Sequence, residues 1–270
     1  MAKMTDNTQQ NPDGRIVVQQ RGKILMIGID RPDKRNGFTP KMFEELAAAY
    51  SMLERTDDLS VGVIHAFGEH FTAGLDLPKI APLRREGRLL YSNSDVDPFN
   101  LREPYRRKPT VIALKGICFT LAVELMLASD VAIAAENCRF AQLEVKRGIM
   151  AGCGATIRMV QRAGWGHAMK LLLTGDEFSA QEALRLNFVQ EVVPTGQELA
   201  RAMEIAEKIA QQAPLAVQAT IENARISLGN GPLVAASRIP PTQHRLFNTE
   251  DAKEGVLSFQ EKRQARFVGK

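Results

Sequence analysis

The sequence predicts an α/β fold that is followed by a region of helices. Short apolar runs that are typical of buried strands alternate with helical patterns over the first half of the chain, and this alternation predicts an α/β core. From Thr195 onward the pattern is helix after helix, with breaks at Pro214, Pro232 and Thr249. The chain has 270 residues and is 44% hydrophobic, which is enough for one large domain or for one domain with an appendage.

Four apolar runs predict the strands of the core, and a first helix is predicted between the first two runs. The runs are ILMIGID (24–30), VGVIHAF (61–67), TVIALKG (110–116) and DVAIAA (130–135). Their near-continuous apolar character predicts strands that are buried on both faces. Thr39 is placed to cap the helix, and Pro40 suits its first position. The apolar stripe of the helix consists of Phe43, Leu46, Tyr50 and Leu53.

Two segments lack these patterns. Residues 1–14 are polar, and we expect a flexible tail there. Residues 78–108 are charged, weakly periodic and rich in Pro, Ser, Asn and paired Arg. They predict a long loop, for which two interpretations stay open: a wall or lid of a substrate pocket, and a solvated connection. We therefore divide the chain into the tail, a core with the active site at 15–195, and a helical region at 196–270.

Charge, cysteine content and hydropathy narrow the classes of function. The net charge of +4 and the pI of about 9.0 suit an anionic ligand as well as nucleic acid and decide neither. Cys118, Cys138 and Cys153 are odd in number and lack CxxC spacing, which argues against a disulfide framework and a zinc site and for a reducing compartment. The sequence contains neither the apolar core of a secretory signal nor a run of about eighteen apolar residues. We expect a cytoplasmic protein.

Two carboxylates stand beside apolar runs, where an isolated charge is costly. Glu124 lies inside FTLAVELMLASD (119–130), and Glu144 lies in FAQLEVKRGIMAGCGATIRM (140–159), before a glycine-rich step and a helix. Two carboxyl groups in different environments can divide the work of acid and base, because burial and neighbouring charges separate their pKa values. A structural interpretation also stays open, in which Glu124 caps a helix start or pairs with an arginine and Glu144 lies at the surface.

Two turns after buried strands are candidates for presenting backbone N–H groups. In GEHFTAGLDL (68–77), Gly74 permits a sharp turn and Asp76 is placed to cap the element that follows. The turn after Lys115–Gly116 leads into the helix of Glu124. N–H groups that point outward from such turns can stabilise a developing oxyanion, and a helix dipole adds to the effect. Ordinary strand-to-helix turns are the alternative interpretation of each.

Taken together, these stretches resemble the crotonase superfamily, whose type member is enoyl-CoA hydratase. The resemblance extends from about Arg15 to Phe267. It is carried by RPDKRNGFT (31–39), FTAGLDL (71–77), KPTVIALKG (108–116), ELMLASDVAIAAENCRFAQLEVKRGI (124–149), LLLTGDEFSAQEAL (171–184) and DAKEGVLSFQEKR (251–263). The order and spacing of these stretches are specific to the superfamily but not to one reaction, because its members hydrate, isomerise, hydrolyse and cleave acyl-CoA thioesters.

The resemblance implies a core of ββα turns wound as a spiral and a C-terminal helical region that mediates trimerisation, often in a dimer of trimers. It implies catalysis by Glu124 and Glu144, an oxyanion hole made by the N–H groups of Leu75 and Leu121, and a water held with the help of Gly152. Positions that match substrate or CoA contacts are Lys34, Arg35, Ala73, Asp76, Leu77 and Lys262, the last of them toward a neighbouring subunit. No cofactor or metal is implied, since CoA is part of the substrate.

The activity implied by the resemblance is hydration of a 2-enoyl-CoA thioester to a 3-hydroxyacyl-CoA. The alternatives are an enoyl-CoA isomerase, for which one base suffices, an RNA-binding homologue, and an acyl-CoA binder without catalysis. The basic runs LRREGR (83–88) and YRRK (105–108) allow RNA binding, but an aromatic content of 6% leaves few rings to stack on bases. We therefore expect an acyl-CoA thioester and further copies of the chain as partners, and neither a membrane nor nucleic acid.

The chain departs from the family at two turns. Thr120, Leu121 and Ala122 stand where most hydratases have glycines, so three side chains occupy space that glycine leaves empty and the turn loses freedom at positive φ. Ala151 stands where a proline is usual, before Gly152. We expect a reshaped acyl pocket or turn in which the N–H group of Leu121 is retained.

Overall fold

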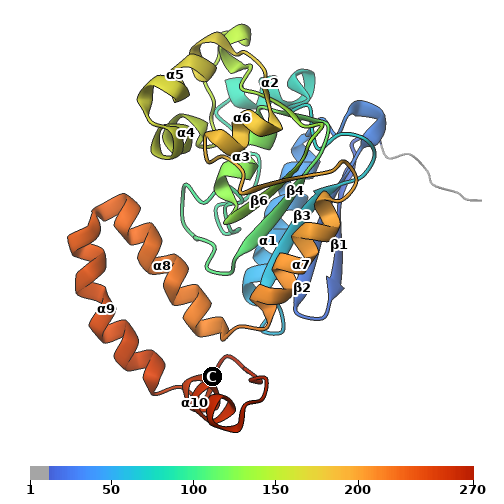
Figure 1. The fold of residues 1–270 in the computed structure, drawn as a ribbon. Helices are drawn as coiled ribbons and strands as arrows, with labels where there is room; N and C mark the ends of the chain where they lie inside the picture. The colour runs from blue at the N-terminus through green and yellow to red at the C-terminus, as the bar shows by residue number, and fades with distance from the viewer. Residues whose placement is uncertain (1–11) are drawn as a thin grey trace, which may run out of the picture.

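The computed structural model describes residues 12–270, and within them the strands form two sheets (Figure 1). In the larger sheet the order is β1-β2-β3-β4-β6-β9, where β1 and β2 form an antiparallel hairpin and the other neighbours pair in parallel. Its strands are β1 (Arg15–Arg21), β2 (Ile24–Asp30), β3 (Val61–Ala66), β4 (Thr110–Leu114), β6 (Val131–Ala135) and β9 (Glu191–Val193).

The central strands are buried on both faces because helices cover both sides of the sheet. Successive residues of β2 alternate between two apolar clusters. Leu25 and Ile27 belong to the cluster that includes α1 (Pro40–Arg55), whereas Ile24 and Met26 belong to the cluster that includes α7 (Glu198–Ala210). The prediction of strands that are buried on both faces is therefore confirmed, although β3, β4 and β6 are each slightly shorter than the apolar run that predicted them.

The predicted first helix, α1, is also confirmed. Its cap is Thr39, whose hydroxyl oxygen accepts a hydrogen bond from the amide of Met42 at 3.3 Å, and Pro40 is its first residue. The four residues of its predicted apolar stripe are all buried.

A second, small sheet lies next to the helix of Glu124. It consists of β5 (Ile117–Phe119), β7 (Arg139–Ala141) and β8 (Phe178–Ser179), and β5 and β7 run parallel. Strands of two or three residues are too short to show a periodic pattern, so the sequence did not predict them. Their role is to place the chain segments that follow β5 and β7 side by side.

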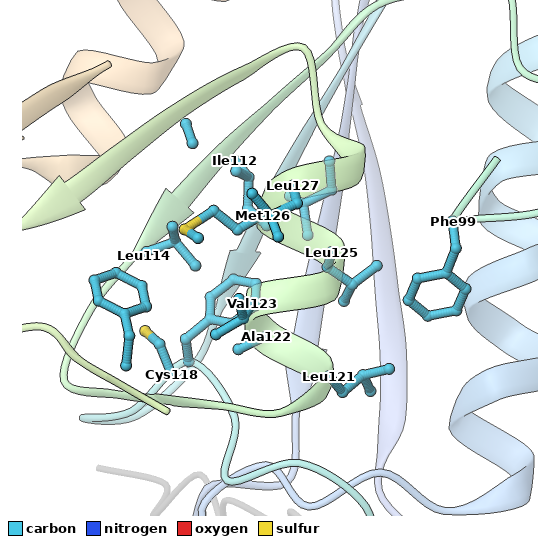
Figure 2. Packing of buried hydrophobic residues seen from close by; sticks show 14 of the residues in the cluster. Phe99, Ile112, Leu114, Cys118, Leu121, Ala122, Val123, Leu125, Met126 and Leu127 are labelled. Atoms are coloured by element: carbon cyan, nitrogen blue, oxygen red, sulfur yellow. The ribbon is translucent and has the colours of Figure 1, made fainter. Parts of the chain in front are cut away.

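Helix α3 (Leu121–Ala128) follows β5 directly, and every one of its residues is buried. Figure 2 shows Leu121 and Leu125 on the side of the helix that faces Phe99, with Leu114 on the opposite side. Because apolar groups surround α3, every residue of this buried helix except Glu124 is apolar.

The segment predicted as a long loop at 78–108 is only partly a loop. Helix α2 (Leu77–Arg85) occupies its start and has a proline in its first turn, where the missing N–H costs nothing. Asp76 precedes this helix, but its side chain does not cap it and instead pairs with Arg31 at 2.8 Å. The predicted cap is therefore wrong, because the guanidinium binds the carboxylate.

A buried carboxylate organises the chain beyond α2. Asp97 accepts hydrogen bonds from the hydroxyl of Tyr91 at 2.8 Å and from the amides of Phe99 at 2.9 Å and Leu101 at 2.7 Å. The ring of Phe99 lies 6.4 Å from that of Phe43 on α1. This part of the segment packs into the core, unlike a solvated connection.

The remaining helices fall into two groups. Between β7 and β9 the chain forms η2 (Glu144–Arg147), α4 (Ala155–Ala163), α5 (Trp165–Thr174) and α6 (Ala180–Arg185), of which α6 contacts the small sheet, while the short η1 (Pro32–Lys34) directly follows β2. The other group leads away from the main sheet in Figure 1 and consists of α8 (Pro214–Asn230), α9 (Pro232–Phe247) and α10 (Glu250–Glu261). We call α8, α9 and α10 the C-terminal arm.

Both ends of the C-terminal region differ in detail from the predicted pattern. Helix α7 packs against the main sheet, although the predicted boundary at residue 195 assigns this helix to the C-terminal helical region. The division of the chain into these regions stays a prediction. At the other end, α10 stops at Glu261, before the end of the predicted helical pattern, and Lys262 adopts a left-handed conformation with φ of 55°. The chain then folds back on α10, where Arg263 pairs with Glu254 at 2.6 Å.

The predicted tail at 1–14 lies mostly outside the described residues, which begin at residue 12. The carbonyl of Pro12 accepts a hydrogen bond from Arg31 Nε at 3.0 Å, and the carbonyl of Asp13 accepts one from Thr39 Oγ1 at 2.7 Å. The described end of the tail is therefore bound to the core. No helix within residues 12–270 has the length and apolar character needed to cross a membrane.

Candidate active site

Three turns lie side by side at one edge of the small sheet. The amide of Phe119 donates to the carbonyl of Thr72 at 3.0 Å, and the amide of Thr120 donates to the carbonyl of Ala141 at 2.7 Å. Phe119 and Ala141 are also partners in the parallel pairing of β5 with β7. Because parallel strands end at the same edge of a sheet, the two predicted glutamates, which follow β5 and β7, emerge next to each other.

Glu124 lies in the first turn of α3 and is only 3% exposed. Its Oε1 accepts hydrogen bonds from the amide of Cys153 at 2.6 Å and from the amide of Ala155 at 3.3 Å. These two donors explain how the apolar run tolerates a carboxylate, since a buried charge is costly unless it is hydrogen-bonded. Burial and, to a smaller extent, the charge of Glu144 nevertheless raise the pKa of Glu124 to about 7, although the two amides act in the opposite direction.

Glu144 has a different environment at the start of η2. It is half-buried, and its Oε2 has no hydrogen-bond partner among residues 12–270. Burial raises its pKa above the ordinary value. One carboxyl group is thus held by two amides, and the other has a free oxygen. This is the kind of pair whose members can take different protonation states.

Two amides in the turns at this edge have no hydrogen-bond partner among the described residues. The bridge between Phe38 and Leu75 uses the carbonyl of Gly74 and the amide of Asp76, so the N–H group of Leu75 is left free. The N–H group of Leu121 is free because Leu121 is the first residue of α3. Over residues 12–270, neither amide donates a hydrogen bond. Both sit at turns that the sequence identified as candidates for an oxyanion hole.

The turn at Gly74 depends on a residue that the sequence analysis missed. Gly74 has φ of 99°, and its amide donates to Thr72 Oγ1 at 3.0 Å. The same hydroxyl donates to the carbonyl of Asn36 at 2.6 Å. Thr72 therefore joins this turn to the chain before α1. A threonine between two apolar residues carries no signal of such a role.

The predicted basic positions Lys34 and Arg35 are exposed and lie beside the same turn. The carbonyl of Arg35 accepts a hydrogen bond from the amide of Ala73 at 2.9 Å. Asn36 is buried, and its side chain donates to the carbonyls of Phe67 at 2.9 Å and His70 at 2.8 Å. The buried amide thus fixes the turn that carries the two exposed cations. Asn36 lies within RPDKRNGFT (31–39), but nothing in that stretch predicted these contacts.

The other predicted positions divide between the site and the arm. Leu77 begins α2, next to Asp76, whose carboxylate is occupied by Arg31. Gly152 is exposed and directly precedes Cys153, whose amide holds Glu124. Lys262 lies at the end of the C-terminal arm, which Figure 1 places at the opposite end of the molecule from α3. The single chain therefore does not bring Lys262 to the glutamates.

The replaced glycines have unequal consequences. Leu121 and Ala122 are helical and buried, so they conflict with nothing in the backbone. Thr120 adopts φ of 49° and ψ of −103°, a conformation that side chains other than hydrogen disfavour. Ala151 is buried in the core cluster. The expected loss of freedom at positive φ is thus concentrated in Thr120.

Comparisons with known proteins agree on one family. A sequence model of the family described as Enoyl-CoA hydratase/isomerase matches residues 19–270. The 2,3-dehydroadipyl-CoA hydratase of Escherichia coli is 31% identical over 94% of this chain and 99% of its own length. The (E)-benzylidenesuccinyl-CoA hydratase of Thauera aromatica is 32% identical over 94% of this chain and 99% of its own length.

A solved structure extends the similarity to the fold. The crystal structure of a probable enoyl-CoA hydratase/isomerase from Mycobacterium abscessus matches with a TM-score of 0.91 and 44% sequence identity. The match covers 94% of this chain and 98% of that chain. The spiral α/β core and the helical region that the sequence predicted are therefore both present in a structural neighbour.

Proposed function

Because this chain belongs to the enoyl-CoA hydratase/isomerase family, we propose that it adds water across the C2–C3 double bond of a 2-enoyl-CoA thioester. The product is a 3-hydroxyacyl-CoA. The observation that carries the proposal is the pair of carboxyl groups, Glu124 and Glu144, at one edge of the small sheet beside two unpaired amides. The reaction needs no cofactor or metal, because CoA is part of the substrate.

The two amides are assigned to the thioester oxygen. Nucleophilic attack at C3 pushes negative charge onto that oxygen, and N–H groups aimed at it stabilise the charge. The amides of Leu75 and Leu121 come from different turns and have no partner among residues 12–270. The dipole of α3 adds to the effect at Leu121, since this residue is at the helix N-terminus.

The two glutamates are assigned to the proton transfers. Glu124 as carboxylate takes a proton from water while the water oxygen forms a bond to C3. Glu144 in its acid form gives a proton to C2. A pKa of about 7 makes Glu124 an effective base near neutral pH, and the raised pKa of Glu144 favours its acid form. Gly152 is assigned to the water, because it directly precedes Cys153, whose amide holds Glu124.

The exposed cations beside the Gly74 turn are assigned to CoA. Lys34 and Arg35 carry positive charge that suits the phosphates of CoA. We assign Ala73, Asp76 and Leu77, which lie on the same turn or directly after it, to the substrate path between these cations and the glutamates. Lys262 takes part only if a second subunit brings its arm to this site. We place the reaction in the cytoplasm, in keeping with three cysteines that are all free.

We propose that the C-terminal arm mediates assembly into trimers or dimers of trimers. The arm exposes large apolar side chains that a single chain leaves uncovered, which favours contact with further copies. They include Leu228, Leu233, Phe247, Val256 and Phe259.

The test is a panel of short, long, branched, dicarboxylic and aromatic 2-enoyl-CoA thioesters. Hydration removes the conjugated double bond, so absorbance of the enoyl thioester falls and the 3-hydroxyacyl-CoA appears in the product analysis. The panel includes dicarboxylic and aromatic thioesters because the two relatives described above are named as hydratases of 2,3-dehydroadipyl-CoA and (E)-benzylidenesuccinyl-CoA. If no member loses absorbance, the hydratase assignment is wrong.

An enoyl-CoA isomerase is the second candidate, since the matching family includes both activities. A 3-enoyl-CoA thioester distinguishes the two, because isomerisation creates the conjugated system and absorbance rises. In an isomerase one base suffices, so one of the variants Glu124→Gln and Glu144→Gln keeps its activity. A hydratase loses most of its activity in both.

A further inference from the structure

Thr120 has a strained backbone that is held on both sides. Its φ of 49° and ψ of −103° lie outside the regions open to a β-branched residue. Its amide donates to the carbonyl of Ala141 at 2.7 Å, and its carbonyl accepts from the amides of Val123 at 2.9 Å and Glu124 at 3.2 Å. These three bonds fix the conformation against its own preference, directly before the free amide of Leu121.

The side chain of Thr120 occupies the space above Gly74. A Cβ atom built on Gly74 would stand 2.0 Å from Thr120 Oγ1, so the hydroxyl oxygen lies against the backbone of the other turn. This oxygen is buried and has no hydrogen-bond partner among the described residues. The two turns that meet at this contact carry the two free amides, at Leu75 and Leu121.

Two unfavourable features therefore coincide at one residue. A strained backbone and a buried hydroxyl without an acceptor both destabilise a fold, and no hydrogen bond within residues 12–270 satisfies the hydroxyl. A glycine at position 120 would remove both the backbone strain and the unsatisfied hydroxyl, because glycine adopts this positive φ readily. It would also remove the side chain that lies against Gly74, and leave a gap between the two turns.

We propose that Thr120 is a positioning residue, a spacer that holds the amides of Leu75 and Leu121 at the separation needed to bind one thioester oxygen. The inference rests on the proposed function of these amides. Two donors converge on one oxygen only at a defined separation, and small errors in such geometry are costly to a rate. Without the spacer, the two turns are free to close on each other.

The test compares Thr120→Gly with Thr120→Ser, which keeps Oγ1 and serves as the matched control. Polarisation of a bound aryl-conjugated enoyl-CoA thioester by an oxyanion hole shifts its absorbance to longer wavelength. We expect Thr120→Gly to reduce this shift and to lower kcat about tenfold with little change in KM. Its Tm is unchanged or higher, because the strain is released. Thr120→Ser keeps the shift and a kcat within about twofold of the unaltered protein.

A double-mutant cycle tests the contact independently of catalysis. Gly74→Ala places a methyl group on Thr120 Oγ1, so it lowers Tm strongly in the unaltered background. In the Thr120→Gly background the overlap is absent, and the same change lowers Tm less. If the changes in Tm caused by Gly74→Ala and Thr120→Gly are additive, the two side chains do not interact across the turns, and the proposal is overturned.

The outcomes separate this inference from the proposed function. If the unaltered protein shifts the absorbance of the bound thioester and Thr120→Gly shifts it equally, with unchanged kcat, the spacer role is wrong and the oxyanion hole stands. If the unaltered protein neither shifts the absorbance nor hydrates any thioester, the proposed function is wrong and the spacer role falls with it.

Discussion

The edge of the small sheet and the C-terminal arm differ in how completely one chain covers its own side chains. At the edge, every residue of α3 is buried and Glu124 is bound by two amides. On the arm, Leu233 is 86% exposed, Phe259 is 85% exposed and Phe247 is 74% exposed. The same sequence thus builds one region that is complete within a single chain and one region that is not.

This difference assigns different tasks to the two regions. The edge needs no partner chain to hold its carboxyl groups and amides, so its chemistry depends on substitutions within it. The arm presents large apolar groups that water solvates poorly, so its properties depend on what covers it. Changes at the edge should alter the reaction and leave assembly intact, and changes on the arm should first alter assembly.

The largest effect is expected from removing the acid or the base at the edge. Glu124→Gln and Glu144→Gln keep the size of the side chain but cannot exchange the proton. We expect each to lower kcat for hydration by about 10²–10⁴-fold, the range of general acid–base catalysis. Steady-state loss of enoyl absorbance measures this effect, and sedimentation shows whether assembly is unchanged.

Glu44→Gln is the matched control, because Glu44 is exposed on α1. Hydration by this control should equal that of the unaltered protein. A near-normal kcat in either active-site variant would contradict the assignment of two carboxyl groups to the reaction.

The second effect is a dependence of the unfolding free energy on pH, which arises because burial raises the pKa of Glu124. Its pKa of about 7 in the folded protein lies above the ordinary value of 4.5, so the folded state binds the proton more tightly than the unfolded state. This contribution is fully present below about pH 4.5 and is lost as pH rises through about pH 7, a loss of about 3 kcal/mol. Glu124→Gln has no such loss.

Denaturant unfolding at about pH 5 and about pH 8 measures this contribution. We expect Glu124→Gln to gain stability over the unaltered protein at the higher pH by more than at the lower pH, since the amide oxygen can still accept from Cys153 and Ala155. An equal difference at both pH values would show that burial does not hold the proton on Glu124.

The elements with long patterns were predictable from the sequence. Helix α1 followed from Thr39, Pro40 and its apolar stripe, and the four central strands followed from their apolar runs. The small sheet was not predictable, because strands such as β5 (Ile117–Phe119) are too short for periodicity and form only through pairing with distant segments. Helix α2 was missed because prolines and charges hide its pattern.

The site was predictable where side chains carry the chemistry and not where the backbone does. Glu124 and Glu144 stood out as carboxylates beside apolar runs, and the family resemblance paired them. The amides of Cys153 and Ala155 that hold Glu124 leave no mark in the sequence, because every residue except proline has such an amide. Asp76 was predicted as a cap, but a distant arginine binds it, and local sequence cannot show that.

The third effect belongs to the arm. Leu233→Asp and Phe259→Asp each place a charge where an apolar side chain is more than four-fifths exposed in the single chain. If these groups lie at the centre of a subunit interface, each change weakens assembly by about 2 kcal/mol or more. Sedimentation should show a shift to smaller species, with the secondary structure retained.

Leu89→Asp is the matched control, since Leu89 is exposed in the loop after α2 and lies outside the arm. Assembly of this control should be unchanged. A chain that sediments as a monomer in every variant and in the unaltered protein would break the comparison, because the arm would then be stable without a partner.

The smallest effect is expected where the arm joins the core. Arg225 of α8 donates to the carbonyl of Arg106 and to Asp130 at 3.3 Å, and Arg106 is itself buried and paired with Asp130 at 2.6 Å. Arg225→Ala removes the outer member of this network but leaves the buried pair intact. We expect a loss of about 1–2 kcal/mol in unfolding free energy, with kcat unchanged.

Arg238→Ala on α9 is the matched control, because Arg238 is an exposed cation of the same arm. Denaturant unfolding should leave this control within about 0.5 kcal/mol of the unaltered protein. Since Arg225 touches the core and none of the groups at the edge, a fall in kcat without a fall in stability would mean that the arm and the edge are coupled. The two regions would then not be separable in function, although they differ so much in how they are covered.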